Sequence, residues 1–297
     1  MIFRRPILLG NPQAGRSRAR RIFPRLETAF LETFPQGRIL RRPPVPAELQ
    51  GGDLLVVYGG DGTLARLLSL PLPNDLPLLL LPGGTGNVLS RYLDVPFDPG
   101  RPEEIFRRLD DARPLPFSPG AAGAVRFCLM AGAGWDGVAA RRVRGKERLG
   151  PLSYYLAGIS AALSRSLPSM SLKILGENGQ EIVREGAIWV LVSRLPPYFG
   201  HFRVPGAGAA GEPPFMVTLV RRSGLRVPGA FLEMLPGMPA GLFSERIPAR
   251  EVALFPEDSL PEDLPCQADG EAIPSFSRVG LSPEALILLT FSGRDKG

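Results

Sequence analysis

Residues 53–63 read DLLVVYGGDGT, and this stretch decides the fold. The run from Leu54 to Tyr58 is continuously apolar, as in a β-strand that helices cover on both faces. The glycines that follow permit positive φ and a close approach of the main chain to a ligand. Helical spacing begins at Leu64, so the turn lies at a helix N-terminus, where free N–H groups favour phosphate. The stretch therefore predicts a buried strand that ends in a phosphate-binding turn.

Asp61 is the unexpected member of this turn. A carboxylate repels a bare phosphate, so its presence indicates a bridging Mg²⁺, a catalytic hydrogen bond or contact with a nucleotide hydroxyl. The turn by itself is weak evidence, because tight glycine turns are common after the strands of any α/β protein. It lacks both the GK[ST] of a P-loop and the spacing of GxGxxG, and we therefore interpret it as a distinct phosphate cradle.

The pattern of strand, glycine-bearing turn and helix occurs three times in the first third of the chain. Residues 6–10 are followed by NPQAG at 11–15, and residues 77–81 are followed by PGGTGN at 82–87. Strands that alternate with helices predict a parallel sheet. Because the turns after parallel strands emerge at the same edge of a sheet, we expect all three turns to converge on one ligand site.

The second part of the chain has a different pattern. A Pro/Gly-rich segment at 113–123 is the predicted domain boundary. Beyond it, short apolar runs separated by turns are typical of an antiparallel sandwich or barrel. One helix interrupts them, with an apolar face made of Leu152, Tyr155, Leu156, Ile159 and Leu163. The expected strands lie at 171–175, 187–193, 215–221, 250–255, 264–268 and 284–291.

These patterns predict two domains. The first, at 1–120, is an α/β nucleotide-binding domain with a parallel sheet. The second, at 121–297, is a mainly antiparallel β-sandwich domain that binds the substrate, and it stays open whether the last residues return to the first domain. A chain of 297 residues suits two cores better than one.

Composition excludes several classes of protein. A content of 44% hydrophobic and 22% charged residues is ordinary for a globular protein. No apolar run approaches the roughly 20 residues that cross a bilayer, and the N-terminal apolar run is too short for a secretory signal. Cys128 and Cys266 are far apart and support neither a disulfide framework nor a zinc site. We expect a cytoplasmic protein in which both cysteines are buried.

The net charge of +6 is compatible with anionic partners such as lipid headgroups or phosphates. No stripe of interleaved aromatic and basic residues indicates base stacking, so we predict no nucleic-acid partner. The sequence leaves the oligomeric state open, a homodimer included.

Three further groups have both a structural and a functional interpretation. Asp269-Gly270-Glu271 fits a type I′ hairpin turn, and spacing alone favours that structural interpretation. The basic side chains of residues 141–148 form a solvated face unless a membrane or phosphate lies beside them. The apolar side chains of residues 231–243 could contact acyl chains, although packing against the sandwich is favoured.

Taken together, these motifs resemble the diacylglycerol kinase catalytic family, specifically the bacterial lipid kinases related to sphingosine kinases, over nearly the whole chain. The family's NPxxG loop is similar to Asn11–Gly15, its GGDGT to 59–63, its GTGN to 84–87 and its DGE to 269–271. Its aromatic-Asp pair resembles Trp135-Asp136. GGDGT is shared with NAD kinases and phosphofructokinases, whereas GTGN and DGE at these distances favour the lipid kinases.

The resemblance implies a NAD kinase-like nucleotide domain with ATP in the interdomain cleft and Mg²⁺ as the second cofactor. Glu271 is implied to be the general base that deprotonates a lipid hydroxyl for in-line attack on the γ-phosphate. Asp61 is implied to act on Mg²⁺ or the phosphates, with Asp136 and Asp269 in supporting roles. The residues implied to bind ATP and its phosphates are Asn11, Gly59, Gly60, Asp61, Gly62, Thr63, Gly84, Thr85 and Asn87.

The sequence departs from the family's pattern at several positions. Ala65 follows GGDGTL where an Asn is usual, and Arg41, Arg42 and Pro43 lie where a threonine is expected. Ser193-Arg194 replaces an Asn-Gly pair. The Asp-Gly pair that the family associates with a magnesium site in its second domain is missing from residues 205–212, where Glu212 is the acid present. A second-domain magnesium site therefore cannot be assumed.

We therefore predict a cytoplasmic lipid kinase, peripherally associated with a membrane, that uses ATP to phosphorylate a lipid hydroxyl. Diacylglycerol, converted to phosphatidic acid, is the default substrate. Two alternatives stay open: a kinase of a soluble acceptor such as NAD, and a nucleotide-binding pseudokinase or regulator, which the missing aspartate and the altered nucleotide pocket motivate. The sequence does not identify the lipid, because headgroup and chain length are read by the shape of a cleft.

Overall fold

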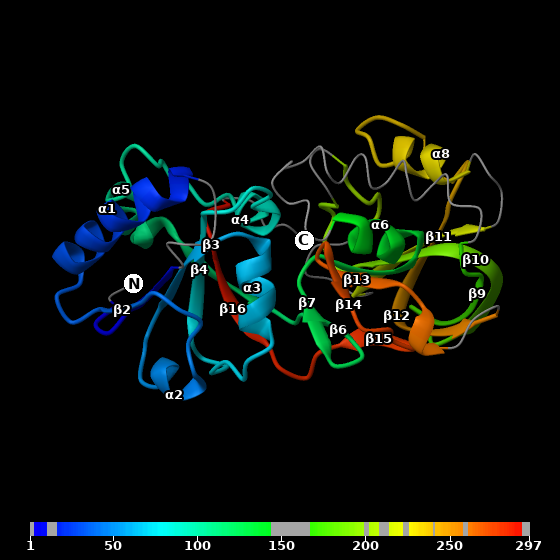
Figure 1. The fold of residues 1–297 in the computed structure, drawn as a ribbon, viewed down its shortest axis with the longest axis horizontal. Helices are drawn as coiled ribbons and strands as arrows, with labels where there is room; N and C mark the ends of the chain where they lie inside the picture. Colours follow the sequence, from blue (N-terminus) through cyan, green and yellow to red (C-terminus); the bar gives the residue numbers. More distant parts are fainter. Residues whose placement is uncertain are drawn as a thin grey trace. The chain divides into compact units, whose positions relative to one another are not determined.

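The computed structural model describes residues 3–10, 17–143, 167–198, 202–207, 214–221, 226–239, 241–257 and 261–292. The chain divides into two compact units (Figure 1). Unit 1 contains Met1–Ser118 and Pro283–Lys296, and unit 2 contains Pro119–Ser282. The predicted helix with its apolar face at Leu152–Leu163 lies outside the described residues. In the part of the chain that the structure describes, no helix is both long and apolar enough to cross a membrane.

Unit 1 is built on a mostly parallel sheet with the strand order β2-β1-β3-β4-β16-β5. All neighbours are parallel except β16 and β5. The strands are β1 (Ile7–Gly10), β2 (Arg38–Leu40), β3 (Leu55–Gly59), β4 (Pro77–Pro82), β5 (Arg113–Phe117) and β16 (Leu286–Thr290). The helices are α1 (Ser17–Thr33), α2 (Pro46–Leu49), α3 (Asp61–Leu68), α4 (Val88–Tyr92), α5 (Glu104–Arg107) and the 3-10 helix η1 (Leu109–Asp111).

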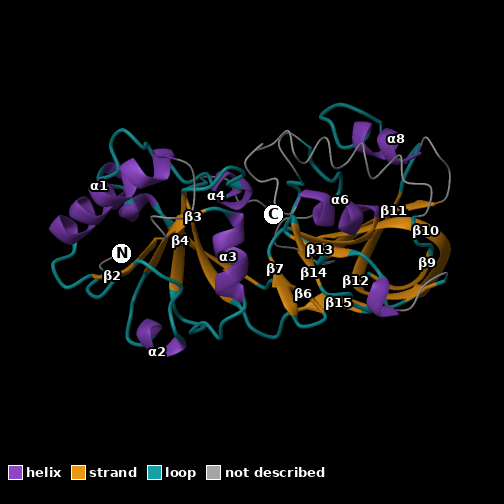
Figure 2. Cartoon of the chain, viewed as in Figure 1, coloured by secondary structure: helices purple, strands orange, loops and turns teal. Residues whose placement is uncertain are grey.

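Helices cover both faces of this sheet, with α1 and α3 on opposite sides of β3 and β4 (Figure 2). Val56 of β3 belongs to the cluster that packs on α1, together with Phe23 of that helix. Val57, the next residue along β3, points to the other face and lines a small hollow with Leu64 of α3. Burial on both faces explains why the sequence of β3 is continuously apolar.

The two units divide between Ser118 and Pro119, inside the predicted boundary segment 113–123. The segment is not a loop, however, because it contains two strands, β5 in unit 1 and β6 (Gly120–Ala122) in unit 2. Pro114 and Pro116 are tolerated because β5 is an outer strand, where alternate N–H groups need no partner in the sheet. Residues 284–291, expected among the sandwich strands, belong instead to unit 1, which is the alternative that the sequence left open for the last residues. β16 lies parallel to β4 in the sheet of unit 1.

Unit 2 is built on a continuous antiparallel sheet, which has 10 strands among the described residues. Its strand order is β14-β13-β8-β10-β11-β12-β15-β6-β7, and β9 pairs with both β10 and β12. The strands not yet located are β7 (Val125–Phe127), β8 (Met130–Gly134), β9 (Met170–Gly176), β10 (Glu181–Ser193), β11 (Phe215–Arg221), β12 (Glu245–Pro256), β13 (Cys266–Ala268), β14 (Glu271–Ile273) and β15 (Arg278–Leu281). The helices are α6 (Trp135–Val143), α8 (Arg226–Leu232) and the 3-10 helix η3 (Pro261–Asp263).

The sheet of unit 2 folds back on itself because its longest strand bends. β10 changes register between Arg184 and Ala187, next to Gly186 at φ +70°. The part before the bend pairs with β9, and the part after it pairs with β8 and β11. The predicted architecture, a parallel α/β domain followed by an antiparallel β domain, is confirmed.

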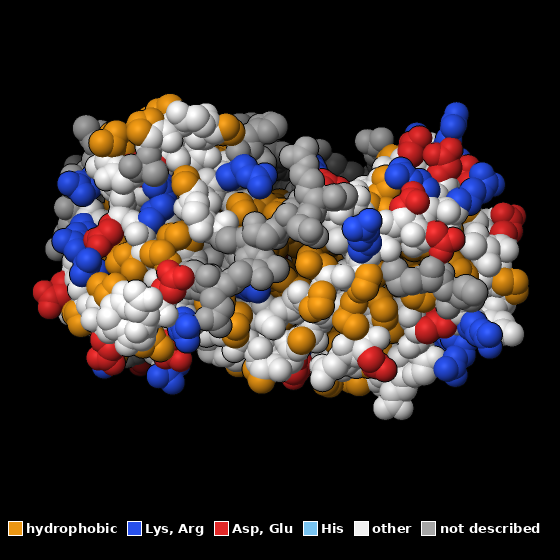
Figure 3. Space-filling model, turned by 180° about the vertical axis from the view of Figure 1, so that it is seen from behind, with side chains coloured by type: hydrophobic (Ala, Val, Ile, Leu, Met, Phe, Trp, Pro, Cys, Tyr) orange, Lys and Arg blue, Asp and Glu red, His pale blue; other side chains and the backbone are white. Residues whose placement is uncertain are grey.

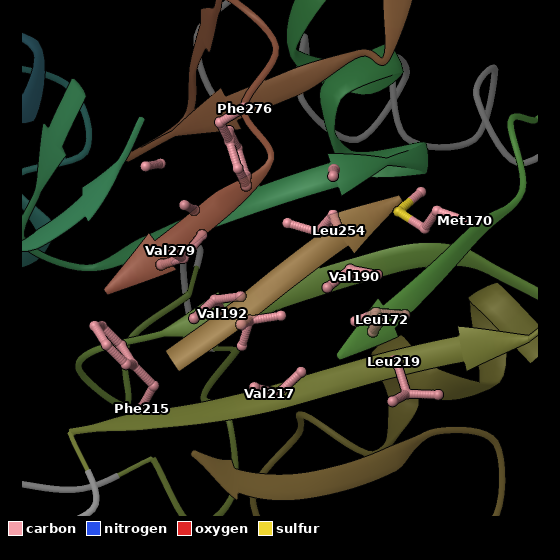
Figure 4. Close-up of a cluster of buried hydrophobic side chains, with 14 of the residues drawn as sticks. Met170, Leu172, Val190, Val192, Phe215, Val217, Leu219, Leu254, Phe276 and Val279 are labelled. Carbon is pink, nitrogen blue, oxygen red and sulfur yellow. The ribbon is translucent and has the colours of Figure 1, made fainter. Parts of the chain in front are cut away.

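The folded sheet encloses the core of unit 2. Figure 4 shows side chains from several strands gathered there, among them Leu172 of β9, Val190 of β10 and Val217 of β11. The opposite face of β10 packs against α8. There Trp189 of β10 stacks on Phe231 of α8, with 5.1 Å between the ring centroids. Both cysteines are buried, as predicted, and they form no disulfide with each other.

Candidate functional site

Two glycine-rich turns of unit 1 lie against each other at the carboxyl ends of β3 and β4. Gly59 and Pro82 are register partners, and the N–H of Gly83 donates to the carbonyl of Gly59 at 2.8 Å. A Cβ added to Gly84 would lie 2.5 Å from the Cα of Gly60. The two turns therefore pack main chain against main chain, and this contact requires glycine at position 84 whether or not a ligand also approaches there.

Asp61, the first residue of α3, joins the two turns through its carboxylate. Its Oδ2 atom accepts the backbone N–H of Val88 at 3.1 Å, and its Oδ1 atom accepts that of Leu89 at 3.2 Å. Both N–H groups lie at the start of α4, where the helix itself offers them no acceptor. A carboxylate suits that position because it also meets the positive end of the helix. Asp61 therefore organises the second turn from the first.

Asn87 closes the second turn on itself. Its Oδ1 atom accepts the N–H of Gly84 at 2.8 Å, and its Nδ2 atom donates to the carbonyl of Gly84 at 2.8 Å. Its backbone is left-handed, at φ +50°, a conformation that Asn adopts more readily than most residues. The local structure thus explains the choice of asparagine before any ligand is considered.

The structure brings together all the predicted phosphate-binding residues that it describes. These are Gly59, Gly60, Asp61, Gly62 and Thr63 in the first turn and Gly84, Thr85 and Asn87 in the second. Asn11 and the rest of the predicted third turn lie outside the described residues. The hollow behind the two turns has a volume of about 10 Å³, room for a water at most. The exposed side of the two turns, which Gly84 to Gly86 form, is therefore the side accessible to a ligand.

In unit 2, Asp269 and Gly270 form the two-residue turn between β13 and β14. Their φ angles are +48° and +87°, as in a type I′ hairpin. The carboxylate of Asp269 accepts the backbone N–H groups of residues 128–130 at 2.8, 2.8 and 3.0 Å. The structural interpretation of this motif is therefore confirmed, with Asp269 as the group that holds the turn. Glu271 follows as the first residue of β14, and it is exposed.

Asp136, near the start of α6, belongs to a buried hydrogen-bond network. It is 5% exposed. The hydroxyl of Tyr198 donates to its Oδ1 atom at 2.6 Å, and the Nε2 atom of Gln267 donates to its Oδ2 atom at 2.6 Å. Burial raises the pKa of Asp136 to about 6, although the hydrogen bonds from Tyr198 and Gln267 oppose the rise.

Sequence reasoning missed Tyr198 and Gln267. They lie 62 and 131 positions from Asp136, so no local spacing connects the three. One signal was available for Gln267, which is a polar residue in the middle of a short strand next to the DGE turn and is 2% exposed.

The described carboxylates near Pro205, where the resemblance places a magnesium site, are paired with arginines. Pro205 and Arg246 line a hollow of about 530 Å³. Glu233 is 2% exposed and accepts from Arg246 at 2.9 Å, and Glu245 pairs with two other arginines. Both of these carboxylates are thus engaged by cations, and Glu212 lies outside the described residues. Within the described ranges, no group of three or more His, Cys, Asp or Glu could hold a metal ion.

The two joined turns lie within a segment that matches the model of a known protein family. Residues 5–116 match the diacylglycerol kinase catalytic domain. The resemblance carried by the motifs is thus confirmed, and it supports a phosphotransferase of the kinase type. An uncharacterized protein of Synechocystis sp. is 24% identical over 151 residues, which are 50% of this chain and 33% of that protein. The chain thus spans about a third of the length of this relative.

Solved structures support the fold of both units. A diacylglycerol kinase structure from Bacillus anthracis str. Sterne has a TM-score of 0.71 and 21% sequence identity, and the alignment covers 98% of each chain. An NAD kinase from Archaeoglobus fulgidus in complex with ATP has a TM-score of 0.51 and 12% identity, over 98% of this chain and 95% of that one. At these identities the similarity shows the two-domain fold of the diacylglycerol kinase and NAD kinase type, and no substrate.

Proposed function

We propose that the protein is an ATP-dependent lipid kinase that phosphorylates a lipid hydroxyl, with diacylglycerol, converted to phosphatidic acid, as the default acceptor. The observation that carries this proposal is the pair of glycine turns joined by Asp61, inside the residues that match the diacylglycerol kinase catalytic domain. The DGE hairpin at 269–271 supports a lipid acceptor, because the resemblance associates this motif with lipid kinases.

In the proposed complex, the turns of unit 1 hold the phosphates of ATP. The N–H groups of Asp61 and Gly62 open α3, an eight-residue helix, ahead of the first N–H that pairs at this end, that of Thr63 with the carbonyl of Gly60, and they suit a phosphate. Thr63 and Thr85 offer hydroxyl groups beside them. Phosphoryl transfer depends mainly on positioning and on neutralisation of charge, which such a rigid cradle supplies.

Glu271 is the proposed general base. As the lipid oxygen forms its bond to the γ-phosphorus, the bond from that phosphorus to the bridging oxygen breaks, ADP leaves, and the hydroxyl proton passes to the carboxylate. Glu271 suits this role because it is exposed and follows a turn that Asp269 holds firmly. The proposal requires that this hairpin reach the nucleotide during the reaction.

Mg²⁺, when bound, would neutralise phosphate charge, and nucleotide enzymes usually hold it through phosphate oxygens and one or two carboxylates. Asp61 is the candidate protein ligand in unit 1. Each of its oxygens already accepts one N–H but retains a second lone pair, so a contact with the metal is compatible with its organising role. We assign no magnesium site to unit 2.

A lipid acceptor requires the protein to work at a membrane surface, and ATP as the donor favours the cytoplasmic side. The proposed association is peripheral. The net charge of +6 and the exposed side chains of Leu232, Met238 and Leu242 support it.

The test is transfer of label from γ-labelled ATP to a total lipid extract, with NAD as a separate acceptor. We expect label in the lipid fraction, and a fall in kcat of about 10²–10⁴-fold in Glu271→Gln, because a general base contributes about that much. Glu185→Gln is the matched control, since Glu185 is an exposed glutamate elsewhere in unit 2. Label on NAD alone, or ATP binding without transfer to any acceptor, would overturn the proposal in favour of a soluble acceptor or of a pseudokinase.

A further inference from the structure

A chain of hydrogen bonds connects the buried acid Asp136 to the hairpin that carries Glu271. Its middle member is Gln267, in the centre of β13. The Nε2 atom of Gln267 donates to Oδ2 of Asp136 at 2.6 Å, and its Oε1 atom accepts the backbone N–H of Gly270 at 2.8 Å. Gly270 directly precedes Glu271 in the turn.

The two partners of Gln267 fix the orientation of its amide. A carboxylate only accepts hydrogen bonds, and a backbone N–H only donates one. The amide therefore makes both bonds in one orientation only. In the flipped orientation its oxygen would face the carboxylate, and its NH₂ group would face the N–H of Gly270. Asp136 thus determines that the amide oxygen of Gln267, an acceptor, faces the N–H of Gly270.

A glycine in the neighbouring strand leaves space for the side chains of Asp136 and Gln267. Gly132 of β8 is the register partner of Gln267. A Cβ at Gly132 would lie 2.1 Å from Oδ2 of Asp136 and 2.8 Å from Nε2 of Gln267. The absence of a side chain at Gly132 is therefore what leaves room for the two groups to meet. Gln267 is 2% exposed, so water does not readily replace its partners.

The turn itself is fixed at both of its central residues. Asp269 is held by the backbone of residues 128–130. Gly270, at φ +87°, is the residue with most conformational freedom, and its N–H is held by Gln267. Without that bond, the Asp269–Gly270 peptide would lose its fixed orientation, and the backbone next to Glu271 would be held on that side only by the pairing of Glu271 with Ala268.

We propose that Gln267 is a positioning residue that, oriented by Asp136, fixes the backbone from which Glu271 acts. This inference rests on the proposed function, because it takes Glu271 to be the general base. Gln267 and Asp136 do not touch the reacting atoms in this scheme. They act through the peptide of Gly270.

The first test measures the backbone of the turn by amide hydrogen exchange and does not depend on kinase activity. Gln267→Met keeps the length of the side chain and removes both hydrogen bonds. We expect amide hydrogen exchange at Gly270 to accelerate about 10-fold, because one hydrogen bond is lost, with little change in β10 and β11. Thr218→Val, which removes the polar group of another buried side chain in unit 2, is the control and should leave Gly270 unchanged. Unchanged exchange at Gly270 in Gln267→Met overturns the inference alone.

The second test is a double-mutant cycle on kcat. Gln267→Met should lower kcat about 10-fold while the KM for ATP stays constant, and should have no further effect in the Glu271→Gln background. An equal loss in both backgrounds indicates a merely structural role and overturns the inference. Wild-type protein that transfers no phosphate to any acceptor overturns the proposed function, and the catalytic part of the inference with it.

Asp136→Asn tests the inference if Gln267→Met does not fold. The hydroxyl of Tyr198 donates to the other oxygen of Asp136, so the oxygen of the introduced amide suits Tyr198 and its NH₂ group then faces Gln267. That NH₂ group can donate to the oxygen of Gln267 and so favours the flipped orientation of that side chain. We expect the same faster exchange at Gly270 and the same loss of kcat confined to proteins that retain Glu271. Normal exchange and normal kcat in Asp136→Asn would overturn the role of the network.

Discussion

The Oδ2 atom of Asp61 lies 3.1 Å from the backbone nitrogen of Val88, so the acid of one glycine turn fixes the helix that follows the other. The two turns come from sequence motifs more than 20 residues apart, since the bond spans 27 positions. A carboxylate that looks misplaced beside phosphate thus has a structural reason to be there. It stabilises the cradle whether or not it also meets a metal ion.

Asp61→Ala should destabilise unit 1 by about 2 kcal/mol, because backbone N–H groups at the start of α4 lose a charged acceptor. The measurement is the free energy of unfolding, together with the affinity for ATP, which should also fall. Asp75→Ala is the matched control, since Asp75 is an exposed acid of the same unit. Equal stability of the two variants would contradict the organising role of Asp61.

Gly84→Ala should destabilise the protein by about 1–3 kcal/mol, because its Cβ would meet the Cα of Gly60 at 2.5 Å and neither backbone can yield cheaply. Thermal unfolding and ATP titration should both report the change. Gly280→Ala provides the control, because a Cβ there meets its nearest neighbour at 3.9 Å, an ordinary contact. A Gly84→Ala protein that unfolds like Gly280→Ala would show that the turns do not pack as described.

The strands and turns of unit 1 could be predicted from the sequence because their signals are local. β3 and β4 are continuous apolar runs, and each ends directly in a glycine-rich turn. β5 was missed because Pro114 and Pro116 read as a linker, and only its place at the edge of the sheet makes them acceptable. The position of β16 depends on its long-range partner β4, which no local pattern reveals.

The difference between local signals and long-range partners also explains which parts of the candidate site could be predicted. Glycine turns are recognised by residue type and order, whereas hydrogen-bond networks depend on which side chains the fold brings together. Asp269 could be singled out as part of a motif, but its role in holding residues 128–130 could not. Gln267 acquires its role only when β13 pairs with β8.

Leu242→Ser should weaken binding to vesicles of phosphatidylcholine and phosphatidylglycerol. Leu242 is 65% exposed, and Leu232 and Met238 are exposed nearby in the chain. Figure 3 shows hydrophobic side chains along the edge of unit 2 at which α8 lies. The acid of this segment, Glu233, is buried against Arg246, so the exposed side carries no competing negative charge from it. If the side chain of Leu242 is buried in the membrane surface, its replacement should weaken vesicle binding roughly 10-fold.

Vesicle co-sedimentation measures this effect, and Val183→Ser is its control. Val183 is 59% exposed in β10 of the same unit and lies outside the α8 segment. We expect Val183→Ser to bind vesicles like the wild type. Equal binding by both variants would show that the apolar side chains after α8 do not contact the membrane.

The buried Asp136 should make the stability of the protein depend on pH in an unusual direction. Burial raises its pKa from the ordinary 3.8 to about 6 in the folded protein. Between these values the folded protein holds a proton that the unfolded chain has released. The contribution of Asp136 to the free energy of unfolding therefore falls as pH rises from about 4 to about 6, by about 3 kcal/mol, and is constant above that window.

Asp136→Asn isolates this contribution, because other acids titrate equally in both proteins. The free energy of unfolding, measured in urea at several pH values, should show the wild type gaining stability relative to Asp136→Asn as pH falls from 7 to 4. In Tyr198→Phe the loss of a hydrogen bond that favours the carboxylate should raise the pKa of Asp136 further and move the window to higher pH. A constant difference between wild type and Asp136→Asn across this range would mean that Asp136 does not titrate within it in the folded protein, and that its carboxylate is better compensated than its burial indicates.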